Sequence, residues 1–394
     1  MTTLHVRSSI SAMPPYVAGK APAAIPGVAR YKLSSNENPY PPLPGVVEAV
    51  DRATRDSNRY PDMGNAELYA ALADSLGVPA ANLAVATGST AIIYDLISSV
   101  CDPGDSVVYP WPSFEAYPIA VLAGNARSEQ VPLTTGGRHD LAAMASRIDD
   151  RTRAVILCTP NNPTGASLTH TEVMDFLEAV PEHVLVILDE AYAEFVRMDD
   201  PLDGIAIAMS HPNVAVARTF SKAYGLAGLR VGYACAPPEI AAALRAVAIP
   251  FGVSLPAQAA AVASLQLRTE LLERVADLVV ERTRVVHGLA EIGWDVGDPQ
   301  GNFVWFTFPD AENATRFVAE AGELGLSVRP LAGTGVRVSI GETEANTRLL
   351  ELAAGTRRFQ TTPTQTTPTQ TTPTRTTPTQ TTAGTSPART TPKE

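Results

Sequence analysis

The sequence predicts an α/β protein with a mostly parallel sheet covered by helices on both faces. From residue 45 onward, short β-branched apolar runs alternate with longer amphipathic stretches, which is typical of a chain of β-α-β units. The expected strands are 106–109, 154–158, 184–188, 214–217 and 231–234, and the expected helices include 67–76, 91–100 and 171–179.

The pattern changes near residue 250, where a smaller α+β domain is expected. A long helical stretch, 258–289, precedes two strand-like runs, 303–308 and 336–340, with a helical stretch between them. The predicted organisation is an irregular, Pro-rich arm at 1–44, a large domain at 45–249, a small domain at 250–356 and a tail at 357–394.

The tail is a low-complexity segment. TTPTQ occurs at 361–365, 366–370 and 376–380, with TTPTR at 371–375. Thr, Pro and Gln bury too little apolar surface to offset the entropy of ordering, so we expect a disordered tail with polyproline II character. A neutral repeat expansion explains it better than modified threonines or a weak partner contact.

Composition excludes several classes of protein. Among 394 residues, 30 are Lys or Arg and 41 are Asp or Glu, which gives a net charge of −11 and disfavours nucleic acid as a partner. The three cysteines, at positions 101, 158 and 235, are widely spaced in apolar context and are expected to be reduced core residues. No apolar run approaches the ~20 residues of a membrane helix. Because the N-terminus also lacks the features of a signal peptide, we expect a cytosolic protein without membrane contact.

The motifs of several common chemistries are absent. The chain has no GxxxxGK[ST], no GxSxG and no HExxH, and its six histidines never fall at metal-ligand spacing. GTGVRV, at 333–338, lacks the third glycine of a dinucleotide fingerprint. Nucleotide, nicotinamide, serine-hydrolase and metal chemistry are therefore disfavoured, and no metal ligand is assigned.

Polar motifs instead follow three expected strands. TPNNPTG spans 159–165, DEAY spans 189–192, and TFSK at 219–222 leads through GLAGLR to Arg230. Ligands of open parallel sheets bind outside the carboxyl ends of the strands, so these loops are expected to meet in one crevice. An amide, a carboxylate, a phenol, a lysine and an arginine would meet there.

These motifs, in this order, resemble those of the fold-type I aminotransferases that depend on pyridoxal phosphate. MPPYVAGK, SSNENPYPPLP, NRYPD, NFVWF and GVRVSIG extend the resemblance over residues 13–352 to the histidinol-phosphate aminotransferase branch. Within that branch they are most similar to actinobacterial aromatic amino acid aminotransferases. The resemblance implies a seven-stranded sheet in the large domain, pyridoxal 5'-phosphate as cofactor, and a homodimer with shared active sites.

The resemblance assigns the cofactor ring to four residues. Lys222 is the catalytic lysine that binds the cofactor covalently and later carries a proton at the substrate Cα. Such a lysine must be unprotonated, which a closed, cation-rich site favours by lowering its pKa. Asp189 is expected to pair with the ring nitrogen, and Tyr192 and Asn162 to donate to the ring hydroxyl.

The cofactor phosphate is expected at the start of the apolar helix near residue 91. Gly88, Ser89 and Thr90 precede this helix, and a helix N-terminus favours an anion. Taken alone this turn is more often an ordinary helix cap. The resemblance adds Ser221 and Arg230 and so makes it a phosphate cup.

Two aromatic residues complete the expected cofactor site. Phe114, in WPSFEAY, matches the ring that stacks on the pyridine. Tyr60, in NRYPD, matches a tyrosine that reaches the phosphate of the neighbouring subunit.

The expected substrate contacts are Arg337, Asn162, Tyr16 and Arg329. Arg337 matches the arginine that clamps the substrate α-carboxylate with a bidentate fork. Tyr16 belongs to the arm and Arg329 to a predicted loop, so both are second-rank contacts.

The expected reaction is a ping-pong transamination between an aromatic L-amino acid (Phe, Tyr or Trp) and 2-oxoglutarate. The alternative is histidinol-phosphate transamination, because the cofactor motifs do not separate the two. A phosphate-bearing substrate needs a second cation, which Arg329 could supply, whereas a phenyl ring needs apolar walls such as Phe251 and Trp305. A non-catalytic regulator or scaffold that binds pyridoxal phosphate ranks third. A decarboxylase or lyase is disfavoured because Arg337 retains the carboxylate.

Overall fold

The structure is a computed structural model that describes residues 6–331, 333 and 335–356. Residues 1–5 of the predicted arm and the whole predicted tail, 357–394, lie outside the described residues. Within the described ranges, no helix combines the length and the apolar character that crossing a bilayer requires.

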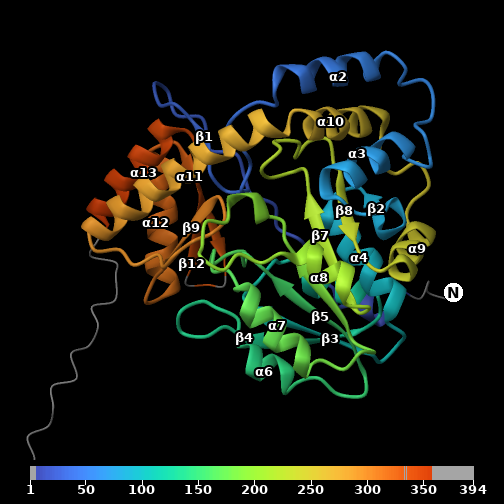
Figure 1. Cartoon of the computed structure of the whole chain (residues 1–394). Helices are drawn as coiled ribbons and strands as arrows, with labels where there is room; N and C mark the ends of the chain where they lie inside the picture. Colours follow the sequence, from blue (N-terminus) through green and yellow to red (C-terminus); the bar gives the residue numbers. More distant parts are fainter. Residues whose placement is uncertain (1–5, 332, 334, 357–394) are drawn as a thin grey trace, which may run out of the picture. The chain divides into compact units, whose positions relative to one another are not determined.

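A seven-stranded sheet forms the centre of the described fold (Figure 1). Its order is β2-β8-β7-β6-β5-β3-β4, and all neighbours are parallel except β8, which is antiparallel to β2 and β7. The strands are β2 (Leu83–Ala86), β3 (Ser106–Trp111), β4 (Arg127–Pro132), β5 (Thr152–Cys158), β6 (Leu185–Asp189), β7 (Val214–Thr219) and β8 (Gly232–Cys235). The mostly parallel sheet predicted from the sequence is therefore confirmed.

All five expected strands of this sheet are present, and two further strands are not visible in the sequence pattern. β4 reads RSEQVP and is largely exposed, because it lies at the sheet edge and needs no apolar run. β2 is a four-residue LAVA segment, which is too short to separate from a helix by periodicity.

Both faces of the sheet are covered, because alternate strand residues pack into two different cores. Ile156 and Ile187 belong to a core shared with α4 (Ser89–Val100), α5 (Tyr117–Ala123) and α9 (Pro238–Val247). Their neighbours Val155 and Val186 belong to a second core. The second core includes residues of α2 (Pro44–Thr54), α3 (Ala66–Leu76), α7 (His170–Ala179) and α8 (Gly204–Ser210). The remaining helices in this part are α1 (Ser8–Ser11) and α6 (Leu141–Ala145).

The predicted helical stretch 258–289 is wrong in one respect, because it is two helices. α10 (Leu255–Gln266) and α11 (Arg268–Glu291) are separated at Leu267. α10 packs against α2 and α3, beside which it lies in Figure 1. This packing joins α10 to elements that precede the predicted domain boundary near residue 250.

A second sheet follows α11. It has the order β11-β12-β9 and is antiparallel throughout. Its strands are β9 (Phe303–Thr307), β11 (Arg329–Leu331) and β12 (Gly335–Ser339), and its helices are α12 (Ala311–Glu323) and α13 (Thr343–Gly355). Near it, β1 (Tyr31–Lys32) from the start of the chain pairs in parallel with β10 (Leu326–Ser327).

Candidate active site

A cavity of about 250 Å³ lies where β5, β6 and β7 end, and β12 and the N-terminal arm close its other side. Most of the residues predicted from the sequence line it together. They are Tyr16, Ser89, Thr90, Phe114, Asn162, Asp189, Tyr192, Ser221, Lys222, Arg230, Arg329 and Arg337. The expected convergence of strand-end loops on one crevice is therefore a feature of the structure.

Two of the residues expected to bind the cofactor, Gly88 and Tyr60, do not line this cavity. Gly88 is the residue before α4 and directly precedes Ser89, which does line the cavity. Tyr60 lies on the surface with 80% of its area exposed, and its ring stacks on that of Phe251 at a centroid distance of 4.6 Å. Tyr60 thus contributes no lining to the cavity of its own chain.

Lys222 follows β7 and points into the cavity. Its Nζ donates to the backbone carbonyl of Ser35 at 3.0 Å and lies 5.8 Å from the centre of the Tyr192 ring. Burial, and then the nearby charge of Arg337, lower the pKa of Lys222 to about 7. A large share of this amine is therefore neutral near pH 7, which a nucleophilic lysine requires.

Asp189 is the last residue of β6 and is almost completely buried. Its Oδ2 accepts a hydrogen bond of 2.7 Å from the Tyr117 hydroxyl, whereas its Oδ1 has no hydrogen-bond partner among the described residues. Burial raises the pKa of Asp189 to about 6, and the Tyr117 bond opposes this rise. A buried carboxylate oxygen without a partner beside a cavity suits a protonated ring nitrogen.

The start of α4 provides a pocket for an anion. Gly88 precedes the helix with a φ of 95° and no capping side chain, so the N–H groups of the first turn remain available. Arg230 lies beside it and donates to the Ser221 hydroxyl at 3.1 Å. A Cβ on Gly88 would lie 2.6 Å from the Arg230 Nη2, so only glycine leaves this guanidinium its place.

Arg337 lies at the opposite side of the cavity, in β12, and is 7% exposed. Its guanidinium donates to the Asn162 side-chain oxygen and, at 2.8 Å, to the carbonyl of Ser34, and its Nε has no partner. In the part of the chain that the structure describes, no carboxylate pairs with it. This buried cation is therefore available to an anionic ligand.

Arg329 was expected in a loop, but it begins strand β11 and is almost fully buried. Antiparallel pairing places it directly opposite Arg337. Its guanidinium forms a 2.5 Å ion pair with Glu115 and also donates to the carbonyl of Val17. The strand was missed because RPL is too short to give a periodic pattern.

Three further residues belong to the site and received no role from the sequence. Tyr117 holds Asp189, Glu115 holds Arg329, and the Asn36 amide donates to the Tyr192 hydroxyl at 3.0 Å. All three lie inside the motifs WPSFEAY and SSNENPYPPLP. The motifs thus pointed to the right segments, but spacing alone does not distinguish these side chains from core or surface residues.

Phe251 and Trp305, which were expected as apolar walls of a substrate pocket, do not line the cavity of their own chain. Phe251 is 40% exposed and stacks on Tyr60. The Trp305 ring instead covers Gly335 across the β9–β12 pair, where it fills the space of a missing side chain. Among the expected aromatic residues, Phe114 and Tyr16 do line the cavity.

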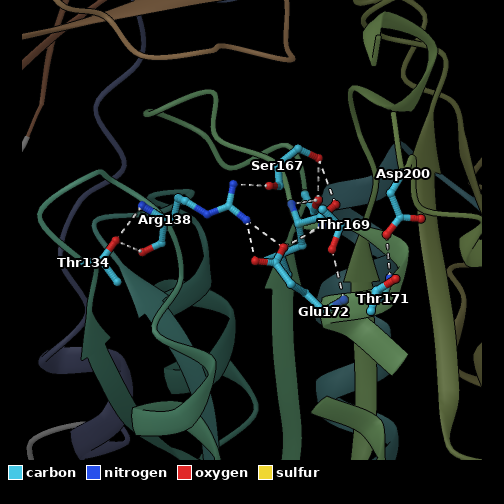
Figure 2. A network of polar contacts seen from close by, with 9 residues as sticks. Thr134, Arg138, Ser167, Thr169, Thr171, Glu172 and Asp200 are labelled. Atoms are coloured by element: carbon cyan, nitrogen blue, oxygen red, sulfur yellow. Dashed lines mark hydrogen bonds and ion pairs between the residues drawn. The ribbon is translucent and has the colours of Figure 1, made fainter. Parts of the chain in front are cut away.

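A polar network joins Arg138 to the end of the segment between β5 and α7, around Ser167 and Glu172 (Figure 2). Arg138 donates to both carboxylate oxygens of Glu172, at 2.7 and 2.6 Å, and to the carbonyl of Ser167. Thr169 and Glu172 form a capping box at the start of α7. The segment 159–169 is thus fixed at its start by β5 and at its end by the cap of α7.

The comparisons with known proteins agree with this geometry. The sequence model of the family described as aminotransferase class I and II matches residues 30–352. An aromatic amino acid aminotransferase of Streptomyces avermitilis is 52% identical over 91% of this chain and 98% of its own length. The Thermobifida fusca protein of the same name is 47% identical over 89% of this chain and 96% of its own length.

Solved structures show the same fold. A histidinol-phosphate aminotransferase from Sinorhizobium meliloti, in complex with pyridoxal-5'-phosphate, superimposes with a TM-score of 0.76. It is 31% identical and covers 83% of this chain and 89% of its own. The Thermus thermophilus aspartate aminotransferase with maleate has a TM-score of 0.78 at 23% identity, over 90% of this chain and 100% of its own.

Proposed function

Because the chain belongs to the class I and II aminotransferase family, we propose that it transfers amino groups from aromatic L-amino acids to 2-oxoglutarate. The family depends on pyridoxal phosphate and acts on amino acids and 2-oxo acids. The observation that carries the proposal is the cavity in which Lys222, Asp189 and Arg337 meet. The names of the relatives at 47–52% identity support the aromatic substrate class.

The residues present fit the cofactor. The unpartnered Oδ1 of Asp189 suits a ring N–H, and the α4 N-terminus with Arg230 and Ser221 suits a phosphate. Phe114 lines the same cavity and offers a ring for stacking. When bound, pyridoxal phosphate supplies an electron sink for the bond between the substrate Cα and its hydrogen.

The chain's own residues then have separate tasks. Lys222, with its lowered pKa, would accept the proton from the substrate Cα and deliver it from the same amine to C4′ of the cofactor. Asp189 keeps the ring nitrogen protonated because a carboxylate partner stabilises the positive charge. Tyr192 presents a hydroxyl that Asn36 fixes in place, and Asn162 bridges toward Arg337.

Arg337 is the proposed clamp for the substrate α-carboxylate. It is buried, it has no carboxylate partner in residues 6–331, 333 and 335–356, and its Nε is unsatisfied. Holding the carboxylate away from the reacting bond favours transamination over decarboxylation. We keep histidinol phosphate as the alternative substrate, because the histidinol-phosphate aminotransferase of Sinorhizobium meliloti is 31% identical to this chain.

We further propose a homodimer in which Tyr60 completes the neighbouring site. Tyr60, Met63, Ile249 and Phe251 are 80%, 61%, 75% and 40% exposed, which is unusual for large apolar side chains. Burying this surface against a second copy would remove it from water. The molecular mass in solution, from light scattering, tests the dimer, and a monomer at assay concentration would contradict it. A cytosolic location stays a prediction.

The deciding experiment is a half-reaction followed by absorbance. Purified enzyme loaded with pyridoxal phosphate is mixed with L-phenylalanine or with L-histidinol phosphate, and loss of the bound cofactor's absorbance band is recorded. Faster conversion with phenylalanine supports the aromatic assignment, and the reverse assigns the alternative. If neither they nor other amino acids convert the enzyme, and Lys222→Ala behaves identically, the catalytic proposal fails and a regulator remains.

A further inference from the structure

Two arginines stand side by side on one wall of the cavity. Arg329 and Arg337 are direct partners in the β11–β12 register, so their side chains project from the same face of the sheet. Both line the cavity, and each is 7% exposed. Like charges at opposed positions destabilise a strand pair unless an anion lies close by.

Only one of the two has such an anion within the described chain. Glu115 forms a 2.5 Å ion pair with Arg329, while Arg337 contacts only the oxygens of Asn162 and Ser34. Glu115 comes from the loop before α5, next to Phe114, and also lines the cavity. Its side chain is 34% exposed, whereas that of Arg329 is 8% exposed.

We propose that Glu115 is a specificity-determining residue, because it neutralises the charge of Arg329. Among the described residues, the guanidinium of Arg337 then remains as the one unpaired cation of this arginine pair for the head group of the substrate, that is, the anionic group next to the reacting carbon. The proposal rests on the proposed function, in which that head group is an α-carboxylate with one negative charge. A carboxylate is matched by Arg337 alone. A phosphate with two charges needs both arginines, so it must displace Glu115 or remain partly unpaired.

Glu115 therefore acts by penalising the wrong head group rather than by attracting the right one. Its negative charge repels a second negative charge near Arg329, and its hydrogen bond occupies the donor that a phosphate oxygen would use. Replacing Glu115 with an uncharged side chain of the same shape removes both effects and leaves the fold of the loop in place.

The test uses two inhibitors that differ only in the head group. 3-Phenylpropionate carries one charge, and 2-phenylethylphosphonate carries two at mildly alkaline pH, while the phenyl ring is the same. Inhibition constants for both are measured on the holoenzyme, for the wild type, Glu115→Gln and the double variant Glu115→Gln/Arg329→Gln. Glu129→Gln is the matched control, because Glu129 also pairs with an arginine, Arg127, but lies outside the cavity.

The ratio that decides is the inhibition constant of the phosphonate divided by that of 3-phenylpropionate. In Glu115→Gln we expect this ratio to fall by about tenfold, because the phosphonate binds more tightly. The double variant should return the ratio to the wild-type value, since it also removes the freed cation. Glu129→Gln should leave the ratio unchanged. The half-reaction rates should shift in the same sense, toward histidinol phosphate relative to phenylalanine.

An unchanged ratio in Glu115→Gln overturns the proposal, as does an equal shift in the double variant. Glu115→Ala serves as the second variant if Glu115→Gln does not fold, and the same ratio decides. The proposed function fails in a different way, through a wild-type preference for histidinol phosphate in the half-reaction. The inhibitor ratio is independent of that preference, so the two failures are distinguishable.

Discussion

The two walls of the active site are built in different ways. The cofactor wall comes from the loops after β5, β6 and β7 and from the start of α4, and its polar residues lie at 89–90 and within 162–230. The substrate wall joins the N-terminal arm to β11 and β12, and contacts such as that between Asn36 and Ser339 span 303 residues. The residues of the first wall can therefore be recognised in the sequence, because they follow strands that end at one edge of the same sheet. The residues of the second wall are much harder to recognise.

The largest effect is expected on the cofactor wall. Lys222→Ala should lower the transamination rate by at least about a thousandfold, because no other amine replaces the proton carrier at Cα. Stopped-flow absorbance with L-phenylalanine measures the loss. Cofactor retention in the variant, measured by equilibrium dialysis, is the control. Activity close to that of the wild type would remove Lys222 from its role.

The second prediction links the two walls through charge. In the cofactor-free protein, capture of pyridoxal phosphate should rise with pH to a plateau with a midpoint near 7, because neutral amine forms as pH passes the lowered pKa of Lys222. An ordinary lysine would have roughly a thousandfold less neutral amine at that pH.

Arg337 contributes to this low pKa, since its positive charge disfavours a second cation. Arg337→Gln should therefore move the midpoint of capture to higher pH. Arg284→Gln, in a surface pair with Glu281, is the control and should not move it. The same midpoint in both variants would contradict a charge link between the walls.

Arg337→Gln also tests the substrate wall directly. The KM for L-phenylalanine should rise by about a hundredfold, with a smaller change in kcat, because the carboxylate loses its charged partner. Steady-state kinetics with Arg284→Gln alongside measures the difference. A fall in kcat at constant KM would assign Arg337 to the chemical step instead.

A smaller effect is expected for Tyr117→Phe. Loss of its bond to Asp189 should lower kcat by roughly tenfold and raise the pKa of Asp189, which burial already raises to about 6. Because the ionised carboxylate is the active form, activity should be lost at a higher pH than in the wild type. Tyr109→Phe, in which another buried tyrosine loses its bond with Gln130, is the control. An acid limb identical to that of the wild type would exclude this role for Tyr117.

The smallest effect is expected at the N-cap of α7, which ends the segment that carries Asn162. Thr169→Ala removes the N-cap of α7 and should lower the free energy of unfolding by about 1 kcal/mol while kcat and KM stay unchanged. Urea unfolding measures the change. Thr315→Ala, at an exposed position inside α12, should be nearly neutral. Altered kinetics in Thr169→Ala would show that the cap also positions Asn162.

Much of the fold and of the cofactor wall was predictable from the sequence, for a physical reason. A buried parallel strand must be a continuous apolar run, so 154–158, 184–188 and 214–217 are visible, and the polar residue that ends each run is visible too. The edge strand β4 is not visible, because half of it faces water.

The substrate wall was predictable only in part. Arg337 could be proposed because GVRVSIG resembles a family motif, but the pairing of Arg329 with Glu115 depends on two segments 214 residues apart. The same holds for Tyr117, whose partner Asp189 lies 72 residues further along the chain. Such contacts are set by tertiary packing, and no local pattern encodes them. The domain boundaries stay predictions.

The segment Ser34–Asn36 has a consequence for how the protein is made. The carbonyls of Ser35 and Ser34 accept from Lys222 and Arg337, and the backbone N–H of Asn36 donates to the Ser339 hydroxyl. A ribosome reaches residue 339 on the order of half a minute after residue 36, at roughly ten residues per second. Until then the segment lacks its contacts with β12, and the pocket around Lys222 is incomplete. A chain released before residue 339 thus carries the cofactor motifs without these contacts, so we expect activity only from chains extended at least that far.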